Sequence, residues 1–123
     1  MAGRIEIKWR TQPEDHDYPA AESYLQLLYD HRAALALVKR LRHAPMTAFK
    51  AKDLFRASRL SLLGVSNSHV KKDQARIRSR TELSPLLLVR SSDHSRVIIA
   101  DGYHRLCAVY SFDEDALIPC KIV

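Results

Sequence analysis

The hydrophobic positions in the first two thirds of this chain follow a helical period. Apolar residues recur every three or four positions, and this spacing predicts three helices, over residues 19–42, 47–58 and 67–79. Pro19 suits the first turn of the first helix. Residues that can cap a helix stand at each start: Asp17 or its neighbour, Thr47, and Ser66 or Asn67.

Strand patterns stand at both ends of the chain. Residues 4–10 alternate apolar and charged side chains, which predicts a strand with one buried face. The apolar run 86–89 and the segment 96–101 are separated by the short polar stretch SSDHS, which predicts a hairpin. A helix over 103–112 and a strand over 117–123 follow. This order predicts an α+β (α/β) fold with a small mixed sheet, closed by a strand-helix-strand unit with a right-handed crossover.

Length and composition suit one small domain spanning residues 1–123. The longest apolar runs are only a few residues, so we expect no membrane span, and the N-terminus lacks the apolar region of a signal peptide. Two cysteines, Cys107 and Cys120, do not make a disulfide framework. We therefore expect buried thiols in a cytoplasmic protein.

Basic residues are concentrated in the middle of the chain. Residues 39–80 hold twelve Lys and Arg against two acidic residues, whereas the rest of the chain holds eight basic and twelve acidic residues. This asymmetry predicts an anionic partner for one surface. A solvated basic face without a partner is the alternative.

The most informative stretch is the turn 101–105, where a strand ends in Asp101-Gly102 and His104-Arg105 opens a helix. Cations at a helix N-terminus are disfavoured by the helix dipole unless an anion is present. With a phosphate there, the free N–H groups, the imidazole and the guanidinium can converge on it. The alternative is structural: Arg105 pairs with Asp101 or with the Asp113–Asp115 cluster, and His104 is a surface residue.

The segment LSPLLLVR…RVIIADGYHRLCAVYSF…LIPCKIV resembles the ParB/sulfiredoxin-like superfamily over residues 82–123, about a third of the chain. The resemblance implies that a Gly-x-x-Arg turn, here Gly102 to Arg105, holds the phosphates of ATP or CTP with Mg²⁺. We expect Lys50 and Lys52 to line the same side.

Departures from the family narrow what the resemblance implies. Sulfiredoxins have a reactive cysteine where this chain has Tyr103, and Cys107 lies about one turn further along. Sulfinic acid reduction is therefore not expected. If the protein is an enzyme, phosphoryl transfer or nucleotide hydrolysis is the expected chemistry, by analogy only.

Two other functions stay open at this point. The string LLGVSNSHVKK resembles the turn of a helix-turn-helix, which would make 47–80 a DNA-binding unit. Its second helix would then direct basic side chains to DNA phosphates: Lys71, Lys72, Arg76 and Arg78. An interaction domain with no chemistry is the other possibility. Residues 14–17, EDHD, carry metal-ligand types, but Asp17 is expected to cap a helix, and we expect no metal site.

Overall fold

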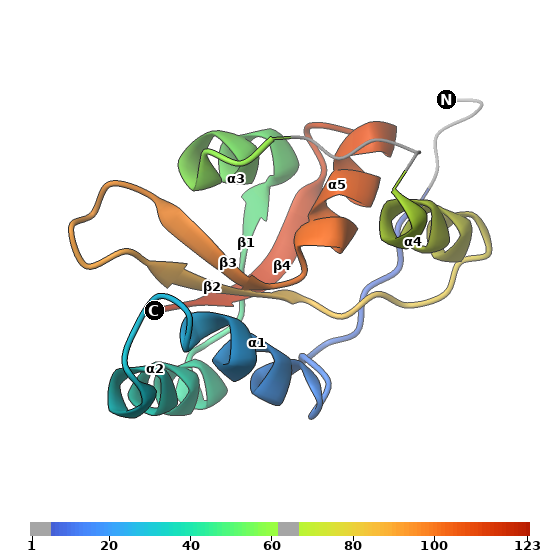
Figure 1. The fold of residues 1–123 in the computed structure, drawn as a ribbon. Coiled ribbons are helices and arrows are strands. Elements are labelled where there is room, and N and C mark those ends of the chain that lie inside the picture. Colours follow the sequence, from blue (N-terminus) through green and yellow to red (C-terminus); the bar gives the residue numbers. More distant parts are fainter. Residues whose placement is uncertain (1–5, 62–66) are drawn as a thin grey trace.

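The computed structural model describes residues 6–61 and 67–123, shown in Figure 1. Its helices are α1 (Asp17–Leu25), α2 (His31–His43), α3 (Ala51–Ser58), α4 (Ser68–Arg78) and α5 (Tyr103–Phe112). Its strands are β1 (Thr47–Lys50), β2 (Leu86–Arg90), β3 (Val97–Asp101) and β4 (Leu117–Ile122). No helix among the described residues is long and apolar enough to cross a membrane.

The four strands form one mixed sheet in the order β1-β4-β2-β3. Strands β2 and β3 are an antiparallel hairpin, β4 runs parallel to β2, and β1 pairs antiparallel with β4 at the edge. The predicted α+β class, mixed sheet and hairpin are confirmed. The predicted right-handed β3–α5–β4 crossover is wrong, because β4 pairs with β2, and β3 runs antiparallel to both.

Helices cover both faces of the sheet, as Figure 1 shows with α1 and α2 on one side and α3 and α5 on the other. Along β2, Leu87 and Val89 pack against the first pair, while Leu86 and Leu88 pack on the opposite face. A strand buried on both faces needs no polar positions, so its sequence is a continuous apolar run. The run Leu-Leu-Leu-Val is therefore the signature of the central position of β2.

The predicted helix over 19–42 is wrong in its continuity, because the structure has two helices there. Helix α1 ends at Leu25, and Asp30 starts α2 by accepting a hydrogen bond from the Ala33 N–H at 2.8 Å. The intervening turn leaves Leu27 80% exposed. Helical spacing continued across this turn, so hydrophobic periodicity alone did not reveal the cap at Asp30.

The predicted helix over 47–58 is also wrong at its start. Residues Thr47–Lys50 form β1, paired with β4 from Thr47 opposite Cys120 to Lys50 opposite Leu117. Helix α3 begins only at Ala51, and Thr47 caps nothing. The partner strand lies about seventy residues further along the chain, and local periodicity carries no information about such a pairing.

The N-terminal strand predicted over 4–10 is reduced, among its described residues, to one parallel bridge between Trp9 and Leu83. Ile5 lies outside the described residues. The N-cap position of α1 is His16, the neighbour of Asp17, but its side chain makes no capping hydrogen bond. Asp17 is the first helical residue, and its carboxylate accepts a hydrogen bond from the Glu14 N–H at 2.9 Å. Asn67 does cap α4, through the N–H groups of His69 and Val70.

Candidate functional site

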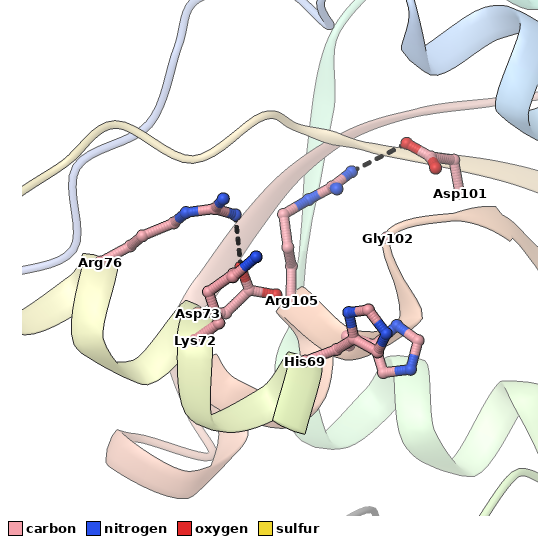
Figure 2. A pocket seen from close by; sticks show the side chains of 8 residues that line it. His69, Lys72, Asp73, Arg76, Asp101, Gly102 and Arg105 are labelled. Atoms are coloured by element: carbon pink, nitrogen blue, oxygen red, sulfur yellow. Dashed lines mark hydrogen bonds and ion pairs between the residues drawn. The ribbon is translucent and has the colours of Figure 1, made fainter. Parts of the chain in front are cut away.

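A polar cavity of about 250 Å³ lies between α4 and the turn that joins β3 to α5. We call it the α4–α5 cavity; Figure 2 shows its lining side chains. Helix α4 contributes His69, Lys72, Asp73 and Arg76, and the β3–α5 segment contributes Asp101, Gly102, His104 and Arg105. The structure thus joins the predicted turn 101–105 to half of the basic residues predicted for DNA contact.

Helical spacing explains which residues of α4 reach this cavity. His69, Lys72, Asp73 and Arg76 follow one another at intervals of three, one and three residues, which places them on one face of the helix. Val70, Gln74 and Ile77 form the buried face, and the Gln74 amide donates a hydrogen bond to the Ser111 hydroxyl of α5 at 2.9 Å. These contacts hold α4 in a fixed orientation against α5.

The remaining basic residues predicted for DNA contact lie elsewhere on α4. Each residue advances the helix by about 100°, so Lys71 and Arg78 fall on the side opposite the cavity. Both are exposed, and the Arg78 guanidinium lies 5.2 Å from the centre of the Phe112 ring. The four basic residues therefore do not form one face.

Gly102 shapes the turn for reasons that involve the fold itself. Its φ of 108° lies in the left-handed region. A Cβ at this position would lie 2.7 Å from Leu86 Cγ and 2.9 Å from the Arg105 guanidinium. The glycine is therefore required by the close approach of β2 and Arg105, whether or not a ligand binds.

Both arginines of the cavity are held by carboxylates. Arg105 donates from Nη2 to Asp101 at 3.0 Å and to the Pro85 carbonyl at 3.4 Å, and Arg76 donates to Asp73 at 2.9 Å. Figure 2 marks both ion pairs with dashed lines. The structural alternative for Arg105, pairing with Asp101, is thus present. Its buried Nε nevertheless has no hydrogen-bond partner among the described residues.

The two histidines of the cavity meet across the α4–α5 contact. Their ring centroids are 4.9 Å apart, at an interplanar angle of 41°. Desolvation lowers the pKa of His104 below its ordinary value, and nearby His69 lowers it further, while Asp73 opposes the shift. His104 is therefore mainly neutral at pH 7 in the free protein.

Burial also acts on the acidic side of the cavity. Desolvation raises the pKa of Asp101, and the adjacent Arg105 offsets part of that rise. Asp73 is almost fully buried and depends on Arg76 for its partner. Removing Arg76 would leave the buried Asp73 carboxylate without its charge partner, and removing Arg105 would do the same to the half-buried Asp101, so both arginines support the structure.

Lys50 and Lys52, which we expected on the same side, do not line the cavity. Lys50 ends β1, opposite Leu117 of β4. Lys52 forms an ion pair of 2.6 Å with Asp115, which raises the lysine pKa and lowers the carboxyl pKa. Lys52 therefore joins α3 to the turn before β4.

A second hollow of about 340 Å³ shares Arg76 and Arg105 with the α4–α5 cavity. Glu14, His16 and Asp17 line it, with ligand-type atoms all within 4.8 Å of one another. Their contacts are mutual: His16 lies 3.0 Å from Glu14 and 3.4 Å from Asp17. In the α4–α5 cavity, the carboxylates of Asp73 and Asp101 are already paired with arginine. Mg²⁺ would therefore compete with these arginines for them.

The sequence reasoning missed His69 and Asp73 as site residues. The sequence feature that could have identified them is their helical spacing relative to Lys72 and Arg76, which places all four residues on one face. Register alone does not say which face meets the turn 101–105.

Comparisons with family models, curated proteins and solved structures found no match for this chain.

Proposed function

We propose that the α4–α5 cavity binds the phosphate of a ligand, either a nucleotide or a nucleic acid. One observation carries the proposal: Lys72, Arg76 and Arg105, with His69 and His104, converge at the N-terminus of α5. Two of these side chains belong to α5, and three come from α4, which ends at Arg78, before β2 and β3. Three of these side chains are exposed and two are half-buried, so all five are accessible to an anion that enters the cavity.

The chemistry of the lining suits a phosphate in two ways. The first N–H groups of α5 lack helical partners, and Gly102 provides no side chain to cap them. A guanidinium carries five N–H donors, so Arg105 can keep its bond to Asp101 and still offer others. Lys72 is exposed at the rim and adds a flexible positive charge.

The size of the cavity limits which part of a ligand it holds. Pockets that enclose a whole small molecule usually measure about 300–1,000 Å³. At about 250 Å³, the α4–α5 cavity suits a phosphate group, with the rest of the ligand outside. The resemblance of residues 82–123 to the ParB/sulfiredoxin-like superfamily supports ATP or CTP with Mg²⁺ as the ligand. On that basis, any turnover would be phosphoryl transfer or nucleotide hydrolysis.

Two neighbouring lysines provide a matched test. Lys72→Ala removes a charge at the cavity rim, whereas Lys71→Ala removes the same charge from the opposite side of α4. Binding of inorganic phosphate, ATP and CTP, with and without Mg²⁺, is measured by thermal shift and titration calorimetry. Ligand at 100 times its dissociation constant should stabilise the protein by about 2.7 kcal/mol. We expect Lys72→Ala to weaken binding about tenfold, the loss of one charge-assisted hydrogen bond, and Lys71→Ala by less than about twofold.

Duplex DNA is the comparison ligand for the helix-turn-helix alternative. If α4 binds DNA, each phosphate contact contributes about 0.9 to the slope of the logarithm of affinity against the logarithm of salt concentration. Equal losses of slope in Lys71→Ala and Lys72→Ala, with no nucleotide or phosphate binding, would favour that alternative. No stabilisation by any of these ligands would favour an interaction domain without chemistry.

A further inference from the structure

We infer that the α4–α5 cavity selects a terminal, dianionic phosphate. We also infer that binding is accompanied by proton uptake, and that the imidazoles of His69 and His104 carry these protons. The inference rests on the proposed function and specifies its ligand and its pH dependence. Three cations line the cavity, Lys72, Arg76 and Arg105, together with the two carboxylates of Asp73 and Asp101. Arg76 and Arg105 are each paired with one of those carboxylates. With both histidines neutral, Lys72 therefore supplies the only formal charge among the described lining residues that a carboxylate does not balance.

The histidine pair is placed to supply the missing charge. His69 belongs to α4 and His104 to α5, and both line the cavity with their ring centroids 4.9 Å apart. A neutral imidazole donates one hydrogen bond, whereas an imidazolium donates two. Two protons would raise the formal charge of the lining from one to three and add two donors on the same wall. A dianion matches this protonated state better than the neutral one.

The groups around the pair decide when it is protonated. On α4 these are Lys72, Asp73 and Arg76, and on the β3–α5 segment they are Asp101 and Arg105. The Tyr103 ring also lies beside His104, at 5.9 Å between centroids. Desolvation, His69 and Arg105 lower the pKa of His104, and Asp73 raises it. A bound anion would oppose the lowering of the His104 pKa, so binding should consume protons between pH 6 and pH 8.

Phosphate monoesters and phosphodiesters differ in the charge that they bring to the cavity. A phosphate monoester has a second pKa near 6 and is mostly dianionic at pH 7. A phosphodiester carries one negative charge and has substituents on two sides of the phosphorus. A hollow of about 250 Å³ accepts a terminal group more readily than a bridging one. The expected ligand is therefore a phosphate monoester or the terminal phosphate of a nucleotide.

Calorimetry on the unmodified protein tests proton uptake directly. Phenyl phosphate is titrated at pH 6.5, 7.0, 7.5 and 8.0, in two buffers of different ionisation enthalpy at each pH. Inorganic sulfate, whose charge does not change over this range, separates titration of the protein from titration of the ligand. We expect between one and two protons taken up near pH 7.5, and affinity for both probes about tenfold higher at pH 7 than at pH 8. Methyl phenyl phosphate, a diester, should bind at least about tenfold more weakly than phenyl phosphate.

Variants assign the protons to the pair. His69→Gln and His104→Gln should each reduce proton uptake, and the double variant should change its affinity less than about twofold between pH 7 and pH 8. The control is His31→Gln, an exposed histidine at the start of α2, which should behave as the unmodified protein. Phosphate binding that depends on Lys72 but takes up no protons would overturn the inference and leave the proposed function intact. No binding of any probe at any pH would overturn both.

Discussion

At the scale of single residues, Gly102 links the fold to the site. Its positive φ and the 2.7 Å approach to Leu86 Cγ leave no room for a side chain. That requirement comes from β2 and Arg105, which pack around the turn. The close approach of Leu86 and Arg105 therefore requires glycine at this turn, independently of any ligand.

Gly102→Ala should destabilise the protein by about 1–3 kcal/mol, because it imposes a left-handed conformation and a steric overlap on alanine. Urea unfolding measures the change. The control is the reverse change, Arg59→Gly, at the left-handed C-cap of α3, where φ is 59°. Glycine is favoured there, so Arg59→Gly should not destabilise the protein. A cost below about 0.5 kcal/mol for Gly102→Ala would contradict this account of the turn.

At the scale of elements, α4 has three sides with different roles. One side packs on α5, one side lines the cavity, and the third carries Lys71 and Arg78 into solvent. The N-cap at Asn67 fixes where the helix begins, and the cavity residue His69 lies in its first turn. The cap therefore supports both the stability of α4 and the geometry of the site.

Asn67→Ala should cost about 1 kcal/mol of stability, as loss of an N-cap usually does. It should also weaken phosphate binding, because fraying of the first turn displaces His69. Asp30→Ala is the matched control, since Asp30 caps α2 through the Ala33 N–H and lies outside the cavity lining. Asp30→Ala should cost about the same stability without changing affinity beyond its effect on folding. Equal losses of affinity in the two variants would show that only global stability matters.

At the scale of the whole molecule, the sheet and its two layers of helices form two apolar clusters, one on each face. Cys107 of α5 and Cys120 of β4 both belong to the cluster shared by α3, α4 and α5, and both are fully buried. This confirms the expectation of buried thiols. Burial raises the pKa of Cys120 to about 12, so this thiol is neutral at ordinary pH.

Both cysteines should react with a thiol reagent only when the core opens. At pH 8 we expect native-state labelling at least about a thousandfold slower than labelling in urea, because reaction requires unfolding of a domain stable by several kcal/mol. Mass spectrometry of the labelled chain distinguishes the two positions. Labelling of Cys107 in the native protein as fast as in urea would contradict the packing of α5 on the sheet.

Local pattern predicted the C-terminal third of the fold well. The hairpin, α5 and β4 lie close to their predicted ranges, because their strands are short, continuous apolar runs separated by polar turns. The same reasoning failed at β1 and at the break between α1 and α2. The strand β1 depends on pairing with β4, which is distant in sequence, and the break between α1 and α2 depends on the capping side chain of Asp30. The period of the hydrophobic positions indicates neither.

Local sequence pattern determined that Gly102, His104 and Arg105 stand where a buried strand gives way to a helix. It also determined that His69, Lys72, Asp73 and Arg76 share a helical face. That this face meets that turn, and that Lys50 and Lys52 lie elsewhere, follows from tertiary packing and not from local pattern. Packing of Val70, Gln74 and Ile77 sets the rotation of α4, and the surface that receives them includes α5, which lies more than twenty residues further along the chain.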